Sequence, residues 1–574
     1  SHLSHVASLQ RAVSQRLGFI KEEEPRPDHQ PTRERPGLTS RNFSTHASST
    51  GPTELSAAAN GKESMDHLIA TYLTREYVNM PIFQLSEFRT SCEDVAETES
   101  FRTGSTAFHG VLNLVISLAC MNTNRASAVL GSDFYARGQA TVSSVSSLEE
   151  PLVLIQSFLL QSQYLNAVGN PRLAWATVGV AIRTAQSLGL NLKSNGHDQG
   201  SRQRRELARR LWHSAAMMES ILALQVGIPP QTPHVFQVPL PSHSDSDYLD
   251  AVLPETSLSS DEPAERPSMV EFLAACARLY SHVGDIMSIE DEFRVSDGGC
   301  SMKKLLSSDM KLFLKVDALS HDWKSSLPSF LQEQDPGPYG PIALRQRTLL
   351  QVRFYYLRIR LYRPLLTLAL AITVRCNCSR AGHRPHLDQA EFASPELPMV
   401  YGISRDASIK CISAAVKLVN LLHWHDLPPQ EEDSSNPGYW ESVNYLHACG
   451  VVLIGARMSP FIGQAQGRGC VSPTDLEASW HKVLELLEYY AGVCRAKGER
   501  LPNTAQLCLR SLNIFSDAVG QGRAEGIGLG IRPDQVEDCD DESGRSSDVQ
   551  SVPERSRRPN SWSWMESLPI DLVD

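Results

Sequence analysis

Apolar side chains recur at helical spacing through most of this chain, and this period constrains the fold more than any other feature. One stretch places them three or four positions apart, at Ala174, Val178, Ala181, Ala185 and Leu188. Such spacing gathers them on one face of a helix. Asn170 can cap the start of that helix, Pro171 suits its first turn, and Gly189 suits its end. The stretch therefore predicts a helix with one buried face.

Two further stretches repeat the period. In the next one the apolar positions are Leu207, Leu211, Ala215, Met218 and Leu222, and the helix-stopping residues Gly227, Pro229 and Pro230 follow. Later the period passes through Leu350, Phe354, Leu357 and Leu361. We expect Pro364 to end that helix, because proline lacks a backbone donor and crowds the preceding turn. Convincing strand alternation is lacking, so the sequence predicts an all-α fold.

The chain has 574 residues, which is more than one compact core usually holds. Residues 64–520 carry the helical period, and we expect them to form one large multi-helix domain. Residues 21–63 are rich in Pro, Glu, Ser, Thr and Arg, which is typical of a disordered linker. Residues 521–574 begin with spaced glycines and continue into an acidic run, which predicts a disordered acidic tail.

A short apolar stripe opens the chain, at Val6, Leu9, Val13 and Leu17. We interpret residues 1–20 as the end of a dimerising coiled coil. A frayed helix is the alternative, because two heptads are too few to be stable alone. The chain starts without Met, which we take to indicate a fragment or a processed product.

The end of the tail mixes acids with large apolar residues, in the segment SWSWMESLPIDLVD. The apolar anchors that we single out are Trp562, Trp564, Leu568 and Leu572. Such a segment cannot bury enough surface to fold alone, but it can fold on a partner. Two interpretations stay open: an activation segment that binds a coactivator groove, and an inert solvated tail.

Net charge and cysteine usage restrict the function classes. The formal net charge is −11, whereas a protein that grips duplex DNA needs Lys and Arg to displace phosphate counterions. The 12 cysteines include no CxxC pair, which fits a reducing compartment better than a disulfide scaffold. No apolar run is long enough to span a membrane. These features argue against DNA binding by the chain alone and against a membrane protein.

The common catalytic signatures are missing: the sequence has no HExxH, no GxSxG and no P-loop. One cluster contains residue types that can bind zinc, namely Cys376, Cys378, His383 and His386. Its C-x-C spacing crowds two ligands, and the stretch looks like a surface loop. We therefore expect neither an enzyme nor a metal or cofactor site in this chain.

A colinear set of short motifs follows residue 152. Two apolar helical segments lead to a basic helix, an acidic residue, a Gly-x-Pro turn and a Leu-Pro pair. The matching residues are Glu206, Arg209, Arg210, Leu211, Trp212, Glu219, Gly227, Pro229, Leu240 and Pro241. In order and spacing, residues 152–241 resemble the middle homology region of fungal binuclear zinc-cluster (Zn2Cys6) transcription factors. We interpret the motif residues as structural, because a motif at helical spacing is more often core than ligand site.

The stretch departs from the family pattern at two positions. The family usually has Arg inside the Gly-x-Pro turn, where this chain has Ile228, and it often has Asp where this chain has Glu219. If those groups pair in relatives, the pair is missing here. We therefore expect apolar packing to hold the turn.

Weaker likenesses extend the match over about residues 64–460. They lie at 80–89, 134–142 and 353–366, and the last one contains the pair Arg363 and Pro364.

The resemblance implies the regulatory part of a nuclear, DNA-associated regulator of RNA polymerase II genes, such as a metabolic or secondary-metabolite pathway regulator. In that family, DNA is bound by a six-cysteine cluster that holds zinc, and this cluster is missing from the chain. Zinc is thus expected only in a missing N-terminal cluster. The implied partners are DNA through that cluster, a second copy of the chain, and coactivators through the tail.

Two other classes stay open beside this interpretation. The chain can be a helical interaction scaffold that never binds DNA. It can also be a small-molecule sensor with an effector pocket between its helices.

Overall fold

The computed structural model describes residues 61–97, 106–122, 125–143, 150–192, 202–232, 238–242, 248–252, 266–292, 308–333, 339–380, 397–426, 439–458, 471–496 and 504–524. Within these ranges the chain is helical, and the only extended pairing is an isolated bridge between Tyr248 and Ser268. The all-α prediction is therefore confirmed. The chain divides into two units, 1–64 and 65–574, and every contact described below lies in the second unit. The expected coiled coil lies outside the described residues, as does nearly all of the expected linker. The expected tail also lies outside them, except that residues 521–524 belong to the last helix.

The first helices of this unit pack around a close helix crossing. They are α3 (Gly61–Arg75), the 3-10 turn η1 (Tyr77–Asn79), α4 (Leu85–Glu97), α5 (Thr106–Met121) and α6 (Arg125–Ser143). At the crossing of α5 and α6, a Cβ added to Gly138 would lie only 2.9 Å from the backbone oxygen of Gly110. Glycine at 138 therefore lets the two backbones approach more closely than any larger residue would allow.

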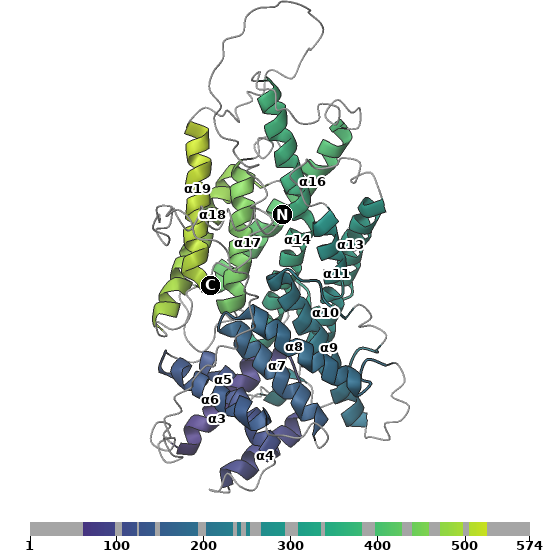
Figure 1. Cartoon of the computed structure of the whole chain (residues 1–574), viewed down its shortest axis with the longest axis vertical. Coiled ribbons are helices and arrows are strands. Elements are labelled where there is room, and N and C mark those ends of the chain that lie inside the picture. Colours follow the sequence, from purple (N-terminus) through teal and green to yellow (C-terminus); the bar gives the residue numbers. More distant parts are fainter. Residues whose placement is uncertain are drawn as a thin grey trace, which may run out of the picture. The chain divides into compact units, whose positions relative to one another are not determined.

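Three helices follow, α7 (Pro151–Ala167), α8 (Pro171–Ser187) and α9 (Arg202–Val226), and each packs on the next (Figure 1). As predicted, the Asn170 side chain caps α8 by accepting from the Leu173 backbone N–H at 3.2 Å. Gly189 and Gly227 follow the ends of α8 and α9 with φ of 70° and 76°, a conformation that glycine adopts without strain.

The predicted buried faces of α8 and α9 are confirmed at every position but one. Leu188 stays 40% exposed, because it stands just after α8, where the chain turns toward Gly189. It therefore does not belong to the buried face of α8.

Shorter elements lead to the longest helix. They are η4 (Leu249–Val252), α10 (Met269–Tyr280), α11 (Val283–Glu292), α13 (Ser308–Ser325) and η6 (Ser329–Leu331). The Ser268 hydroxyl caps α10 by accepting from the Val270 backbone N–H at 3.2 Å. The Trp323 indole Nε1–H of α13 donates to the Ala275 carbonyl of α10 at 2.9 Å.

Helix α14 (Pro341–Arg380) corrects one prediction, because it continues through Pro364 instead of ending there. A proline inside a helix costs about 3 kcal/mol. The residues that follow it are apolar and buried, among them Leu365, Leu366 and Leu370. Burying each such side chain contributes about 1.5–3 kcal/mol, so packing outweighs the cost of the proline.

The same continuation corrects the interpretation of Cys376 and Cys378 as part of a surface loop, because both positions lie on α14. His383 and His386 lie outside the described residues. Among the residues that are described, no group of three or more His, Cys, Asp or Glu side chains could hold a metal ion.

The last helices form a bundle against α14. They are α16 (Leu397–Asp426), α17 (Tyr439–Arg457), α18 (Pro473–Ala496) and α19 (Thr504–Ala524). Helix α16 packs along α14, and α17, α18 and α19 pack on one another (Figure 1). A Cβ on Gly450 of α17 would lie 2.5 Å from Leu512 Cδ1 of α19, so this contact is also close.

Candidate regulatory core around helices α9 and α14

The family motif lies on α9, and its polar residues hold the segment that returns after the helix. Glu206 bonds Arg209 at 2.7 Å through Oε1 and accepts from the Ser242 backbone N–H at 2.9 Å through Oε2. The His213 ring nitrogen Nε2 lies 3.1 Å from the Pro239 carbonyl. Burial lowers the pKa of His213, so the ring is neutral at physiological pH and Nε2 donates. Two points of the returning segment, Pro239 and Ser242, are thus held against α9.

The expectation that apolar packing holds the Gly-x-Pro turn is wrong. Glu219 is 3% exposed, and its two oxygens accept from the Gln231 backbone N–H at 3.0 Å and from the Thr232 hydroxyl at 2.5 Å. Ile228, by contrast, is 36% exposed. A buried carboxylate requires such donors, and here they come from the chain just beyond the turn instead of from an arginine inside it.

The other motif residues of α9 are core residues by position. Leu211 and Trp212 are buried, and the Arg210 side chain is also largely buried. The structure places these residues inside the helical packing. Gly227 and Pro229 stand at the turn itself, where the Pro229 carbonyl accepts from the Gln231 side chain at 3.0 Å.

Helix α14 carries a second set of polar side chains, and these reach most of the surrounding elements. At its start, Gln346 donates to the Val78 carbonyl at 2.7 Å and Arg347 to the Phe330 carbonyl at 2.8 Å. Arg345 bonds the Thr74 carbonyl at the end of α3. Burial and the nearby Arg75 lower the pKa of Arg345 to about 9, so its guanidinium is still charged at neutral pH. These contacts join α14 to α3, η1 and η6.

In the middle of α14, Arg353 is buried between α10 and α17. It pairs with Glu441 of α17 at 3.2 Å and lies 3.6 Å from the Cys276 sulfur of α10. Burial alone would lower the pKa of Arg353, but the opposite charge of Glu441 raises it well above its ordinary value. Burial also raises the pKa of the neighbouring Tyr280. The arginine is therefore charged and the phenol neutral at physiological pH.

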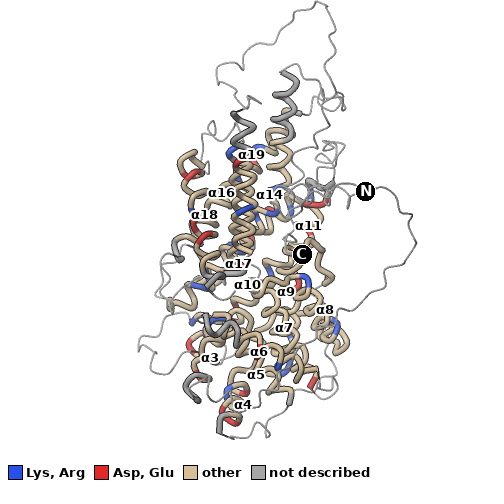
Figure 2. Tube along the Cα trace, turned by 60° about the vertical axis from the view of Figure 1, so that its left-hand side comes forward, with Lys and Arg blue, Asp and Glu red and all other residues tan. Residues whose placement is uncertain are grey.

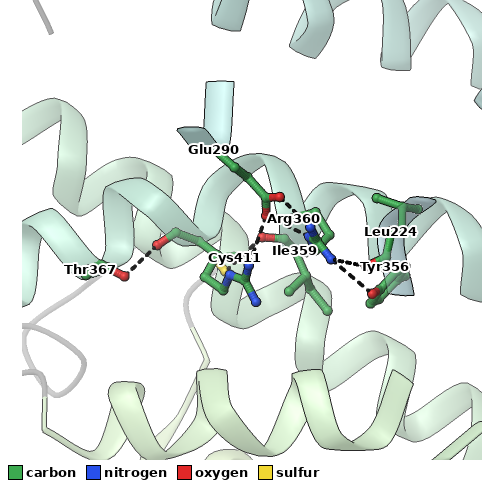
Figure 3. Close-up of polar contacts among 8 residues, drawn as sticks. Leu224, Glu290, Tyr356, Ile359, Arg360, Thr367 and Cys411 are labelled. Carbon is green, nitrogen blue, oxygen red and sulfur yellow. Dashed lines mark hydrogen bonds and ion pairs between the residues drawn. The ribbon is translucent and has the colours of Figure 1, made fainter. Parts of the chain in front are cut away.

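Two turns further on, Glu290 of α11 pairs with two arginines of α14, Arg360 and Arg363. Figure 3 shows the contact between Glu290 and Arg360. The Oε1 of Glu290 accepts from Arg360 Nε at 2.6 Å and from Arg363 Nη2 at 3.0 Å. Arg360 also donates to the Leu224 carbonyl at 2.9 Å, near the end of α9. The Glu290 and Arg360 side chains are each only 11% exposed. Burial acts to lower the pKa of Arg360, but the Glu290 charge outweighs it and the pKa is raised.

A third ion-pair group lies on the side of α14 that faces α13 and α16. Asp317 of α13 lies 3.5 Å from Arg358 and 3.2 Å from Lys410 of α16, and it accepts from the Tyr362 hydroxyl. Burial acts to raise the pKa of Asp317, but Tyr362, Lys410 and Arg358 together lower it. Asp317 is therefore ionised and ties α13, α14 and α16 together.

Sequence reasoning singled out Arg363 and Pro364 but missed the acids that the α14 arginines need, which are Glu290, Asp317 and Glu441. A usable signal existed, because arginines inside an apolar helix require buried partners. The partner of Arg360 lies 70 positions away, however, and no local spacing identifies it. Trp562, Trp564, Leu568 and Leu572 of the expected activation segment lie outside the described residues.

The arrangement is a set of ion pairs and hydrogen bonds that join α14 to its neighbours. α14 is bonded to α3, η1, α9, α10, α11, α13 and η6 before it in the chain, and to α16 and α17 after it. Such a helix can transmit a movement of the helices that precede it in the chain to the helices that follow it.

Comparison with known proteins gives the class of this domain. The family described as fungal specific transcription factor domain matches residues 69–332. This match, together with the similarity to fungal transcription factors, supports the presence of the fungal transcription factor middle homology domain in this part of the chain. The matched region ends before α14, so α14 bonds elements of the family domain to helices beyond it.

The chain is similar to several named fungal regulators. It is 25% identical to sorbicillinoid biosynthetic cluster transcription factor 2 of Penicillium rubens, over 60% of this chain and 47% of that protein. It is 23% identical to transcription factor FBD3 of Fusarium pseudograminearum, over 73% of this chain and 53% of that protein. Nitrogen assimilation transcription factor nit-4 of Neurospora crassa is 24% identical over 45% of this chain and 23% of that protein. The chain thus spans about half the length of the first two relatives.

No helix in the described part of the chain combines the length and the hydropathy that a membrane crossing needs. Basic and acidic residues are interspersed along the described helices (Figure 2).

Proposed function

We propose that this chain is the regulatory part of a nuclear fungal transcription factor that acts on RNA polymerase II genes. The observation that carries the proposal is the fungal specific transcription factor domain at residues 69–332, set in an all-helical fold. The relatives, which are named as transcription factors of biosynthetic and assimilation genes, support a pathway-specific regulator rather than an enzyme.

Within this proposal the parts of the chain have separate roles. Residues 64–520 form the helical domain, whose elements α14 holds together through buried ion pairs. Residues 1–20 contribute to a homodimer, and the acidic tail, 521–574, recruits coactivators. DNA is read by a zinc cluster that is not in this sequence, and zinc is required only there. The net charge of −11 supports the assignment of DNA binding to a separate segment.

A tethering experiment tests the proposal. The full chain, 1–574, is fused to an unrelated DNA-binding domain, and the output of a reporter gene carrying that domain's site is measured in a fungal host. We expect the fusion to change the output relative to the DNA-binding domain alone, while the unfused chain does not. If the reporter output is the same with the fused chain as with the DNA-binding domain alone, a role in transcription is contradicted.

A second arm isolates the tail. Residues 533–574 are fused alone and compared with a variant in which Trp562, Trp564, Leu568 and Leu572 are all replaced by Ala. We expect the parent fusion to activate and the variant to be silent, because the apolar anchors fill the coactivator groove. Equal activity of both fusions would mean that charge alone explains the signal.

A further inference from the structure

The outer face of α8 gathers exposed apolar side chains. Leu173 and Val180 are 50% and 47% exposed, and Leu188 and Leu192, just beyond the helix, are 40% and 56% exposed. Large exposed hydrophobic residues elsewhere in the described chain occur singly, which is ordinary for a protein surface. A cluster of four along one helix and its end is not ordinary and indicates a contact surface.

This face is also open to a close partner. Leu173, Ala176 and Val180 are spaced so that they follow one line along the helix, and all three are exposed. A Cβ on Gly179, beside that line, would meet no other atom within 4 Å. Small residues next to larger apolar ones let another segment lie against the helix backbone. We call Leu173, Ala176, Val180, Leu188 and Leu192 the α8 face.

The charge of the α8 face selects among partners. Residues 171–192 contain no Asp or Glu, and the two arginines among them, Arg172 and Arg183, are exposed. The adjoining start of α9, which packs on α8, adds the exposed Arg202 and Arg204. An apolar stripe whose own stretch, residues 171–192, carries only basic charges fits an acidic segment that carries apolar anchors.

The chain itself contains such a segment. Residues 561–574 carry the anchors Trp562, Trp564, Leu568 and Leu572, three acids and no basic residue. A second copy of α8 fits less well, because it would bring two acid-free, arginine-bearing faces together. We propose that residues 561–574 of the same chain dock on the α8 face.

The length of the chain allows this docking. Between Ala524, which ends α19, and Trp562 lie 37 residues. A stretch of that length can span up to ~120 Å. A domain of this size has a radius of gyration of only ~23 Å.

The docking has a regulatory consequence that rests on the proposed function. The apolar anchors that bind the α8 face are the ones that a coactivator needs. A docked tail is therefore withheld from coactivators, and a partner or modification that releases it switches the protein on.

Photo-crosslinking in the full chain tests the docking. A photoreactive amino acid replaces Ala176, whose side chain is exposed, and an equal mixture of isotopically light and heavy chains is irradiated at low concentration. We expect a crosslink to residues 555–574 within one chain, with no light–heavy product. The same probe in place of Leu314, an exposed position on α13, is the control and should not capture the tail. Crosslinks between copies, crosslinks to another segment, or no crosslink at the α8 face overturn the proposal.

A matched pair of variants separates docking from its consequence. Val180→Glu places a carboxylate in the α8 face, where we expect it to abolish the crosslink. Met399→Glu makes the same change at a site that is 54% exposed on α16, where the crosslink should remain. In the tethered reporter, Val180→Glu should raise the output and Met399→Glu should not. A crosslink that survives Val180→Glu contradicts the docking site, whereas a lost crosslink with unchanged output contradicts only the regulatory consequence.

Discussion

The buried arginines on α14 need acidic partners that neutralise their charge, and Glu290 is the clearest example of such a partner. It neutralises both Arg360 and Arg363 at a site where its own side chain is 11% exposed. A buried pair contributes little net stability compared with an apolar core, but removing one partner leaves a buried charge uncompensated. Here the loss of a single carboxylate would leave two arginines without an acid.

Glu290→Gln should therefore destabilise the domain by about 3–5 kcal/mol, the usual result of breaking a buried ion pair. The measurement is chemical denaturation followed by circular dichroism. Glu477→Gln is the matched control: Glu477 also pairs with an arginine, Arg457, but is 51% exposed. That variant should lose no more than about 1 kcal/mol. Similar losses in the two variants would contradict the buried role of Glu290.

Trp212 of the family motif is 3% exposed, so its ring is part of the core. Trp212→Ala should cost about 3–5 kcal/mol, because truncating a buried aromatic side chain leaves a cavity. Leu314→Ala, at a side chain that is 58% exposed, should change stability by no more than about 0.5 kcal/mol. If the Trp212→Ala variant has the same melting temperature as the parent, the ring does not support the fold.

At the scale of secondary-structure elements, helices α5 and α6 cross at Gly138, where the lack of a side chain lets their backbones come close. A Cβ at Gly138 would lie 2.8 Å from Leu114 Cγ and 2.9 Å from the Gly110 backbone oxygen. The Leu114 side chain can shift, but the Gly110 backbone moves only if the helices separate. This crossing is thus fixed by backbone contact.

Gly138→Ala should lower the melting temperature, although alanine is the better helix former. Gly492→Ala on α18 is the control, since a Cβ there meets no other atom within 4 Å. That change should stabilise by about 0.5–1 kcal/mol. The two substitutions are chemically identical, so shifts of the same sign would contradict the close crossing.

Sequence patterns predicted the elements better than the contacts between them. The apolar period located α8 and α9, and the cap at Asn170 followed from residue type alone. The end of α14 was missed, because the burial that carries the helix past Pro364 depends on helices far away in the chain. The partners of Glu219 were missed because one is a backbone N–H, which carries no sequence signature, and the other is the hydroxyl of Thr232, 13 positions away.

At the scale of the whole molecule, the chain lacks the charge that DNA binding requires. We expect it to bind duplex DNA only non-specifically at physiological salt, with a dissociation constant on the order of 10⁻⁴–10⁻⁶ M. A gel-shift titration against random and genomic fragments measures this. Nanomolar, sequence-specific binding by residues 1–574 would refute the assignment of DNA reading to a segment outside this sequence.

We propose that this chain works in the nucleus as part of a DNA-associated regulator. Chromatin immunoprecipitation tests it most directly, using the tagged gene product in the fungus that encodes it and RNA measurement after deletion of the gene. We predict enrichment at a limited set of promoters whose transcripts change in the deletion strain. A tagged protein that is expressed but enriched at no promoter, together with an unchanged transcript profile, would contradict the account.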